Sequence, residues 1–182
     1  MADVRPTTLT LPVAPERDHI QGRPDAAVVL LEYGDYECPY CGRAYPIVRQ
    51  LQSALGERLC VAFRNFPLNN VHPHASAAAQ AAEAAAAQGK FWEMHALLFE
   101  HQGDLEPHDL DRYALRLGLE IYKFQSDVSG QRYAKRVRDD YESGQASGVR
   151  GTPTFFINNA RYEGKLAYDD LLAAIGKASA NS

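Results

Sequence analysis

The 182-residue sequence predicts an α/β fold in which an all-helical segment separates a β-α-β half from a β-β-α half. Three observations support this prediction. The run Ala27–Tyr33 is apolar and rich in β-branched and aromatic residues, which is typical of a buried strand. A helical pattern follows that strand directly. The strand pattern is absent between residues 73 and 145 and returns at Thr154–Ile157.

The first half of the core is predicted to begin with an edge strand at Thr7–Val13. Pro12 limits this strand because proline lacks the backbone N–H that pairing needs. Residues 16–25 are expected to form a loop. After the buried strand, apolar residues at helical spacing predict a helix that stops at Gly56, a residue type favoured just after helix ends. Leu59–Phe63 indicates a second core strand, so the helix is the crossover of a β-α-β unit.

The rest of the chain follows from local patterns. Alanine content and apolar spacing predict five helices, over residues 75–87, 91–101, 107–117, 121–128 and 131–141. The second half is expected to hold the strand at 154–157, a turn at 158–159, a short strand at 161–163 and a helix at 168–178. We therefore divide the chain into an N-terminal extension (1–22), a core (23–68 and 149–182) and a helical insertion (69–148).

Composition restricts the classes of function. A net charge of −4 and a pI near 5.8 argue against nucleic acid as the main partner. The sequence has no run approaching the ~20 apolar residues of a membrane-spanning helix, so no membrane association is expected. Residues 1–21 lack the apolar run of about 7 to 15 residues that a signal peptide carries, which predicts a cytoplasmic protein. A Gly-rich phosphate loop is also absent, so no nucleotide cofactor is expected.

Cys38 and Cys41 are the main candidates for chemistry because they stand where the buried strand turns into a helix. Unpaired N–H groups at a helix start stabilise negative charge, and a Cys-x-x-Cys thiol in that position typically has its pKa lowered into the range of roughly 3.5–7.5. The alternatives are two inert thiols or half of a zinc site, which His72 and His74 could complete. A second Cys-x-x-Cys pair is absent, so redox chemistry is favoured over a metal site.

Glu32 is unusual because it lies within the predicted buried strand. Burying a carboxylate costs several kcal/mol unless it is protonated or paired, so its pKa should be raised. The alternative is that the strand ends early and Glu32 is solvated.

Cys38-Pro39-Tyr40-Cys41 after a strand, with Gly151-Thr152-Pro153-Thr154 before a later strand, resembles the thioredoxin-fold thiol–disulfide oxidoreductases. Within that superfamily the chain most resembles the DsbA-like branch. The similar segments extend from about Glu32 to Gly164, and they are residues 32–41, 65–68, 72–75, 88–92 and 148–153.

This resemblance implies roles for the site residues. Cys38 would attack a substrate disulfide, Cys41 would resolve the mixed disulfide, and Glu32 would exchange protons with Cys41. Thr152-Pro153 would form a cis peptide bond that faces Cys38 and lends its backbone to a bound peptide. The alternative for Pro153 is an ordinary trans proline at the start of a strand.

Pro39 and Tyr40 complete the predicted substrate-binding residues, together with Thr152 and Pro153. Because Tyr40 has no imidazole to favour the thiolate, we predict a potential between about −120 mV, typical of DsbA, and about −270 mV, typical of thioredoxin. Pro-Tyr is a glutaredoxin-type dipeptide, so glutathione is a predicted co-substrate beside protein or peptide thiols and disulfides. Apart from the redox-active pair, we expect no cofactor and a monomer.

Two other classes of function stay open. One is a glutathione-dependent isomerase or transferase, although such proteins usually lack the second cysteine. The other is a non-catalytic metal-binding or partner-binding module. Cys60, on a predicted core strand, and His95, among apolar residues, are expected to be structural.

Overall fold

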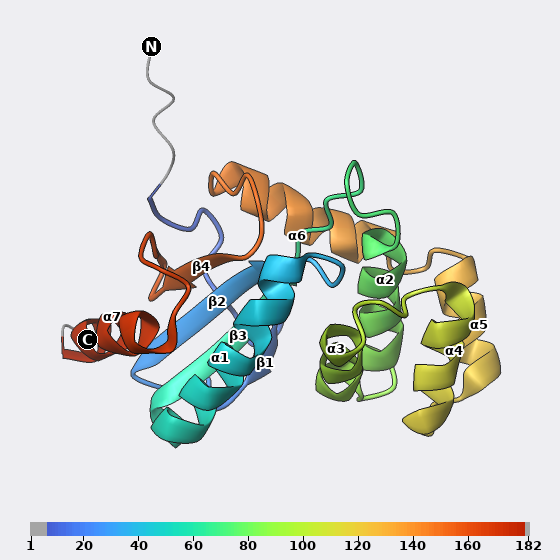
Figure 1. Ribbon diagram of the computed structural model, residues 1–182, viewed down its shortest axis with the longest axis horizontal. Helices are drawn as coiled ribbons and strands as arrows, with labels where there is room; N and C mark the ends of the chain where they lie inside the picture. Colours follow the sequence, from blue (N-terminus) through green and yellow to red (C-terminus); the bar gives the residue numbers. More distant parts are fainter. Residues whose placement is uncertain (1–6, 181–182) are drawn as a thin grey trace, which may run out of the picture.

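The computed structural model describes residues 7–180 of the chain. Its centre is a five-stranded sheet in the order β1-β3-β2-β4-β5 (Figure 1). The strands are β1 (His19–Gln21), β2 (Val28–Gly34), β3 (Leu59–Asn65), β4 (Thr154–Ile157) and β5 (Ala160–Arg161). β2 and β3 are parallel and the other pairs are antiparallel, so the sheet is mixed. The expected α/β fold with a β-α-β unit is confirmed.

Helices cover both faces of this sheet. The α1 helix (Pro39–Leu55) connects β2 to β3, and α7 (Tyr168–Ala180) packs beside it on the same face, where Leu51 and Leu171 are fully buried. On the opposite face lies α6 (Ala134–Ala146), whose Tyr141 ring stacks on Phe66 at 4.3 Å between centroids. Since alternate residues of a strand face opposite sides, β2 contributes to both layers.

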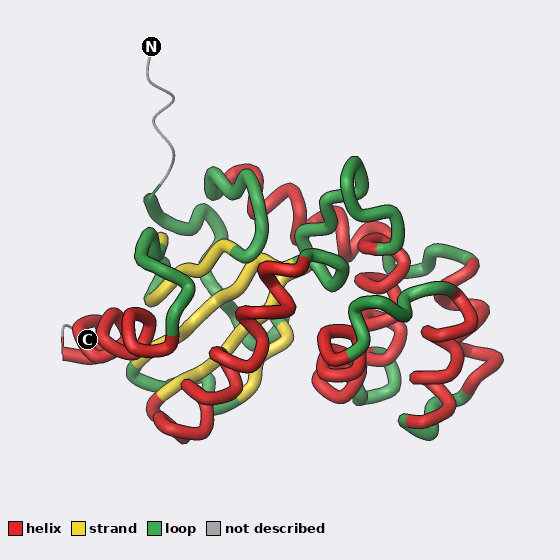
Figure 2. The backbone as a smooth tube through the Cα atoms, viewed as in Figure 1, coloured by secondary structure: helices red, strands yellow, loops and turns green. Residues whose placement is uncertain are grey.

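The remaining helices are α2 (Ala75–Ala86), α3 (Phe91–Glu100), α4 (Pro107–Arg116) and α5 (Ile121–Ser129). They form a group beside the sheet (Figure 2). Their hydrophobic core is continuous with Cys38 and Cys41, because one cluster of buried residues contains both cysteines and the apolar faces of these helices. The expected helices of the insertion are confirmed, and the turn between β2 and α1 (residues 35–38) is part of their interface with the core.

The expected edge strand at Thr7–Val13 is wrong. Within it only Thr8 makes a bridge, to Ala160, while the edge strand is β1, in the segment expected to be a loop. The reason is a buried side chain: the Arg64 guanidinium donates to the carbonyls of Leu11 at 2.8 Å and Pro12 at 3.1 Å. These carbonyls are therefore satisfied without a strand partner.

Two boundaries also differ from the prediction. The last helix of the insertion begins at Ala134, because Gln131 adopts a positive φ of 52° that a helix does not accommodate. The helix continues to Ala146. The strand β5 covers only Ala160–Arg161. Among residues 7–180, no helix combines the length and apolar character needed to cross a membrane. The division into core and insertion stays a prediction.

Candidate active site

Cys38 and Cys41 lie at the start of α1, directly after the end of β2. Cys38 is the residue before the first turn and Pro39 opens the helix, where a missing N–H costs nothing. The Cys38 N–H donates to the Asp35 carbonyl at 3.1 Å, which closes the turn between strand and helix. Both residues are free thiols; Cys38 is 4% exposed and Cys41 is fully buried.

The two thiols have opposite ionisation behaviour. The pKa of Cys38 is lowered to about 5 despite its burial. The main cause is a hydrogen bond from the Cys41 thiol. Further hydrogen bonds come from the Thr152 side chain and from the N–H groups of Cys41 and Tyr40. Burial, followed by the hydrogen bond to Cys38, raises the pKa of Cys41 well above its usual value. At neutral pH the pair therefore combines a thiolate at Cys38 with a thiol at Cys41.

Thr152 and Pro153 come from the segment before β4, and Thr152 contacts Cys38. The Thr152–Pro153 peptide bond is cis, as the resemblance implied. In the thiol form Cys38 Sγ donates to the Thr152 carbonyl oxygen at 3.4 Å, across 114 positions of sequence. The Thr152 hydroxyl is buried and has no hydrogen-bond partner in the uncharged site, so it is free to donate to a Cys38 thiolate.

Glu32 lies in the middle of the sheet, opposite Phe63 of β3 and Phe155 of β4. Its side chain is 5% exposed and its Oε1 atom has no hydrogen-bond partner. Burial, and secondarily the charge on Cys38, raises the pKa of Glu32 to about 8. The alternative of a solvated Glu32 is therefore wrong, and the carboxyl group is protonated at neutral pH.

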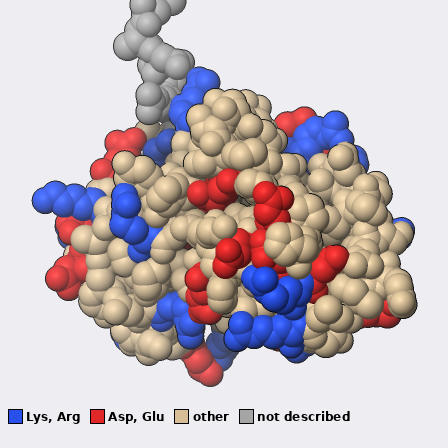
Figure 3. Space-filling view, turned by 45° about the vertical axis from the view of Figure 1, so that its right-hand side comes forward, with Lys and Arg blue, Asp and Glu red and all other residues tan. Residues whose placement is uncertain are grey.

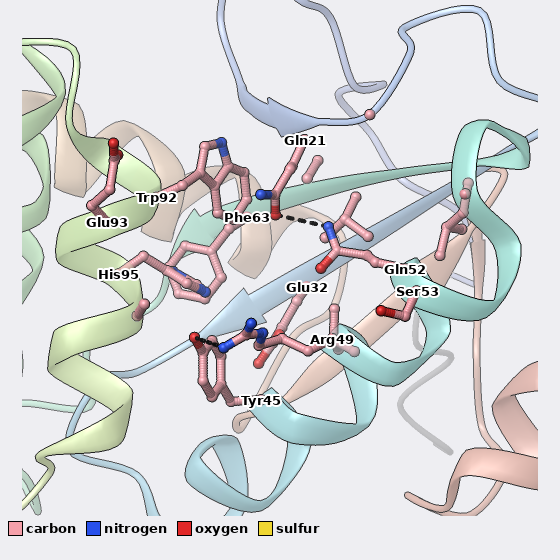
Figure 4. Close-up of a pocket in the computed structure, with 17 residues that line it drawn as sticks. Gln21, Glu32, Tyr45, Arg49, Gln52, Ser53, Phe63, Trp92, Glu93 and His95 are labelled. Carbon is pink, nitrogen blue, oxygen red and sulfur yellow. Dashed lines mark hydrogen bonds between the residues drawn. The ribbon is translucent and has the colours of Figure 1, made fainter.

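A cavity of about 690 Å³ adjoins this carboxyl group. Figure 4 shows Glu32 among the residues that line the cavity, together with Tyr45 and Arg49 of α1 and His95 of α3. At its edge, Arg49 lies within 3.5 Å of the Tyr45 hydroxyl. The buried acid is therefore enclosed by protein on the sheet side and adjoins an open space on the side of the helices.

His95 and Cys60 are buried, as expected. His95 lies within the core, where its Nδ1 atom hydrogen-bonds to the Tyr36 hydroxyl at 3.0 Å. Burial, followed by the charge on His19, lowers the pKa of His95 to about 3, so the ring is neutral. Cys60 is buried on β3, and burial raises the pKa of its thiol.

Asp35 was not predicted, although it organises the turn before Cys38. One carboxylate oxygen accepts the N–H of Glu37 at 2.8 Å, and the other accepts the N–H of Leu68 and the Nδ1–H of His72, both at 2.8 Å. Its own N–H donates to Cys41 Sγ at 3.5 Å. An Asp directly after a strand, bonding two residues on, is a turn pattern that sequence analysis could have found.

The two histidines that could have completed a zinc site bind carboxylates. His72 pairs with Asp35, and His74 pairs with Glu37 at 2.8 Å and Glu106 at 3.2 Å. The hydrogen bond to Glu37 raises the pKa of His74. Across the described residues 7–180, no group of three or more His, Cys, Asp or Glu side chains is arranged to hold a metal ion. His74 instead links Glu37, in the turn of residues 35–38 that we call the active-site turn, to Glu106 at the start of α4.

Tyr40 is 58% exposed, and the Arg43 guanidinium lies 4.3 Å from the centre of its ring. Tyr40 is the second residue of α1, two positions after Cys38. Figure 3 shows acidic and basic side chains interspersed over one face of the protein, with acidic groups gathered near its middle. A single-sign charged surface of the kind that binds nucleic acid is not seen on that face.

Comparisons with known proteins agree with this geometry. A family model described as Thioredoxin matches residues 15–177. The crystal structure of oxidised BdbD from Bacillus subtilis superposes with a TM-score of 0.83 at 23% identity, covering 97% of this chain and 98% of that one. A thioredoxin-like oxidoreductase from Silicibacter pomeroyi superposes with a TM-score of 0.81 at 28% identity, covering 93% and 95% of the two chains.

The relatives found by sequence are named as antiporters and not as oxidoreductases. A protein of Salinispora arenicola named Na(+)/H(+) antiporter NhaA 1 is 47% identical over 174 residues, which is 96% of this chain but 26% of that protein. The protein of the same name from Mycobacterium sp. (strain KMS) is 48% identical over 170 residues, 92% of this chain and 28% of that protein. This chain thus spans about a quarter of the length of these relatives.

Proposed function

Because this chain belongs to the thioredoxin family and has a DsbA-like fold, we propose that it is a thiol–disulfide oxidoreductase that acts on protein or peptide disulfides through Cys38 and Cys41. The observation that carries the proposal is the contrast between the two thiols. One is ionised beside a cis-proline loop and the other is kept protonated beneath it. Such a pair can attack a disulfide with one sulfur and retain the other for resolution.

In the reductive direction, the Cys38 thiolate attacks one sulfur of a substrate disulfide. A bond forms between that sulfur and Cys38, the substrate S–S bond breaks, and the other substrate sulfur leaves as a thiolate. The Glu32 carboxyl group first releases its own proton towards the adjoining cavity, and Cys41 then transfers its proton to the resulting carboxylate and attacks Cys38. The Cys38–Cys41 disulfide forms and the second substrate thiolate leaves, so two electrons pass from the dithiol to the substrate.

Glu32 is suited to this proton transfer because its pKa of about 8 lies near neutral pH. A group with such a pKa can accept a proton and return it with little cost in either direction. The adjoining cavity, lined in part by Tyr45 and Arg49, gives the carboxyl group an open side on which to exchange that proton.

The substrate peptide is proposed to lie against Thr152 and Pro153, beside the exposed ring of Tyr40 and the ring of Pro39. The Thr152 carbonyl already contacts Cys38 Sγ, so a peptide held there brings its sulfur to the nucleophile. Glutathione stays a predicted co-substrate. For a protein in the cytoplasm, the predicted compartment, net reduction or isomerisation is favoured because thiols there are kept reduced.

Insulin reduction with glutathione as the electron source tests the proposal. Cys38→Ser should abolish turnover, and Cys41→Ser should accumulate mixed disulfides because the resolving thiol is missing. Cys60→Ala is the matched control, since that thiol is buried on β3 away from the pair, and it should retain activity. If Cys38→Ser reduces insulin at the parent rate, the assignment of the nucleophile is wrong.

A second proposal concerns the partner. The relatives of 47–48% identity are named Na(+)/H(+) antiporters and are much longer than this chain. We propose that this chain acts on, or together with, a transporter of that class. Membrane extract incubated with Cys41→Ser should yield a mixed disulfide with such a transporter, and Cys38→Ser/Cys41→Ser should yield none. Trapping of soluble proteins alone would reject this partner and leave the exchange chemistry intact.

A further inference from the structure

Gln102 is a residue of the α3–α4 loop that reaches the active-site turn from the helical side of the molecule. Its Nε2 atom donates two hydrogen bonds to backbone carbonyls, to Tyr36 at 2.9 Å and to Cys38 at 2.8 Å. The two carbonyls flank the turn from which the Cys38 side chain projects. A single amide group thus binds two carbonyls of the turn, which are 66 and 64 positions away from Gln102 in the sequence.

Gly42 provides the space for this amide. A Cβ atom at Gly42 would lie 2.0 Å from Gln102 Oε1 and 2.7 Å from its Cδ atom, which is far inside van der Waals contact. The Gly42 N–H donates to the same Cys38 carbonyl at 3.0 Å, as the first hydrogen bond of α1. Gln102 therefore packs onto the first turn of α1 at Gly42, where the absence of a side chain leaves room for the amide.

We propose that Gln102 is a positioning residue that holds the Cys38 turn in the geometry needed for attack on a disulfide, so that the helical insertion sets the reactivity of the cysteine pair. This inference rests on the proposed function. The N–H groups of Tyr40 and Cys41 stabilise the Cys38 sulfur only while their peptide units point at it. Holding the carbonyls of Tyr36 and Cys38 restricts the rotation of this turn.

The chemistry of the side chain explains why glutamine suits the position. Its two N–H groups can serve two carbonyls at once, whereas glutamate of the same shape has no donor. Leucine would fill a similar volume but leave both carbonyls without the amide. Without the amide the turn can rotate, the N–H groups of Tyr40 and Cys41 point less directly at the thiolate, and the pKa of Cys38 should rise by roughly half to one unit.

Gln102→Leu and Gln102→Glu test the proposal, with Gln125→Ala as the matched control because Gln125 donates to Asp111 on the exposed face of the insertion. The pKa of Cys38 is read from thiolate absorbance against pH, and the potential of the pair from equilibration with glutathione. Both Gln102 variants should raise that pKa by at least half a unit and make the pair more reducing. The control should change neither. A folded Gln102→Leu protein with the parent pKa and potential would overturn the proposal.

A second pair of variants keeps the test decisive if a Gln102 variant folds poorly. Gly42→Ala alone should displace the amide and raise the Cys38 pKa, but in the Gln102→Ala background the added methyl group has room and should change nothing further. If Gly42→Ala raises the Cys38 pKa by the same amount with and without Gln102→Ala, the proposal is overturned. Because the pKa is measured without turnover, absence of insulin reduction by the parent protein would reject the proposed function and not this inference.

Discussion

The Glu32 carboxyl group shows how much one buried residue can influence stability and chemistry together. Its folded pKa is about 8, against about 4.5 in the unfolded chain. Between these values the unfolded state loses the proton and the folded state keeps it, so the free energy of unfolding falls as pH rises. The same property that makes Glu32 suitable for proton transfer thus weakens the fold at neutral pH.

Glu32→Gln should remove this pH dependence, because the amide does not ionise. We expect the difference in free energy of unfolding between variant and parent to grow by about 2–4 kcal/mol in favour of the variant from pH 5 to pH 8. Urea denaturation of the reduced proteins measures it. In a Cys38→Ala background the dependence should move to lower pH, since the charge on Cys38 contributes to the raised pKa. If the difference in free energy of unfolding between Glu32→Gln and the parent protein is the same at all pH values, burial does not raise the pKa of Glu32.

At the scale of elements, α1 depends on its two ends. Its start holds the cysteines, and its last turn is closed by Gly56, whose N–H donates to the Gln52 carbonyl and whose φ is +53° with ψ −128°. This backbone conformation is costly for residues that carry a Cβ atom. The helix therefore stops at the residue where the chain must turn towards β3.

Gly56→Ala should lower the free energy of unfolding by about 1–2 kcal/mol, because the strain is in the backbone and no neighbour lies within 4 Å of the added methyl group. Gly176→Ala is the matched comparison. It lies on the exposed side of α7 with equally open surroundings and helical backbone, so it should stabilise by about 0.5–1 kcal/mol. Thermal or urea unfolding of both proteins separates backbone strain from packing. Equal effects of the two substitutions would contradict this explanation.

At the scale of the whole molecule, Arg64 ties the N-terminal segment to the sheet. It is fully buried and pairs with buried Asp18 through two hydrogen bonds of 2.8 and 2.9 Å, while also donating to the Tyr33 hydroxyl. Through these contacts, residues before β1 are held against β2 and β3. The pairing is satisfied on both sides, as a buried charge requires.

Arg64→Met should destabilise the protein by about 3–5 kcal/mol, because the buried Asp18 carboxylate loses the two hydrogen bonds from Arg64 and keeps only those from Arg17 and the Ala14 N–H. Arg64→Met/Asp18→Leu removes both charges and should recover much of that loss. Urea denaturation of the single and double variants at pH 7 gives the comparison. A double variant no more stable than Arg64→Met would show that the ion pair is not the main contribution of Arg64.

Most of the fold could be predicted from the sequence, and so could the position of Cys38 and Cys41 at the start of α1. The positions of β2, α1, β3 and the helices α2 to α5 follow from apolar periodicity, and Glu32 was identified by its charge within an apolar strand. The edge strand was missed because His19–Gln21 is a short polar segment whose conformation depends on pairing with β3. A pattern of one or two half-buried residues is too weak to distinguish strand from loop.

The sequence by itself determined the order of elements, the cysteine pair at a strand-to-helix junction and the resemblance that places Pro153 opposite it. Only the tertiary structure decided that Asp35, His74 and Gln102 hold the active-site turn. Each of these contacts joins polar groups from separate elements, and a polar residue leaves the same local pattern whether it is solvated or paired. Apolar periodicity in the sequence indicates which side of a helix or strand is buried, whereas the partner of a side-chain hydrogen bond depends on which elements pack together.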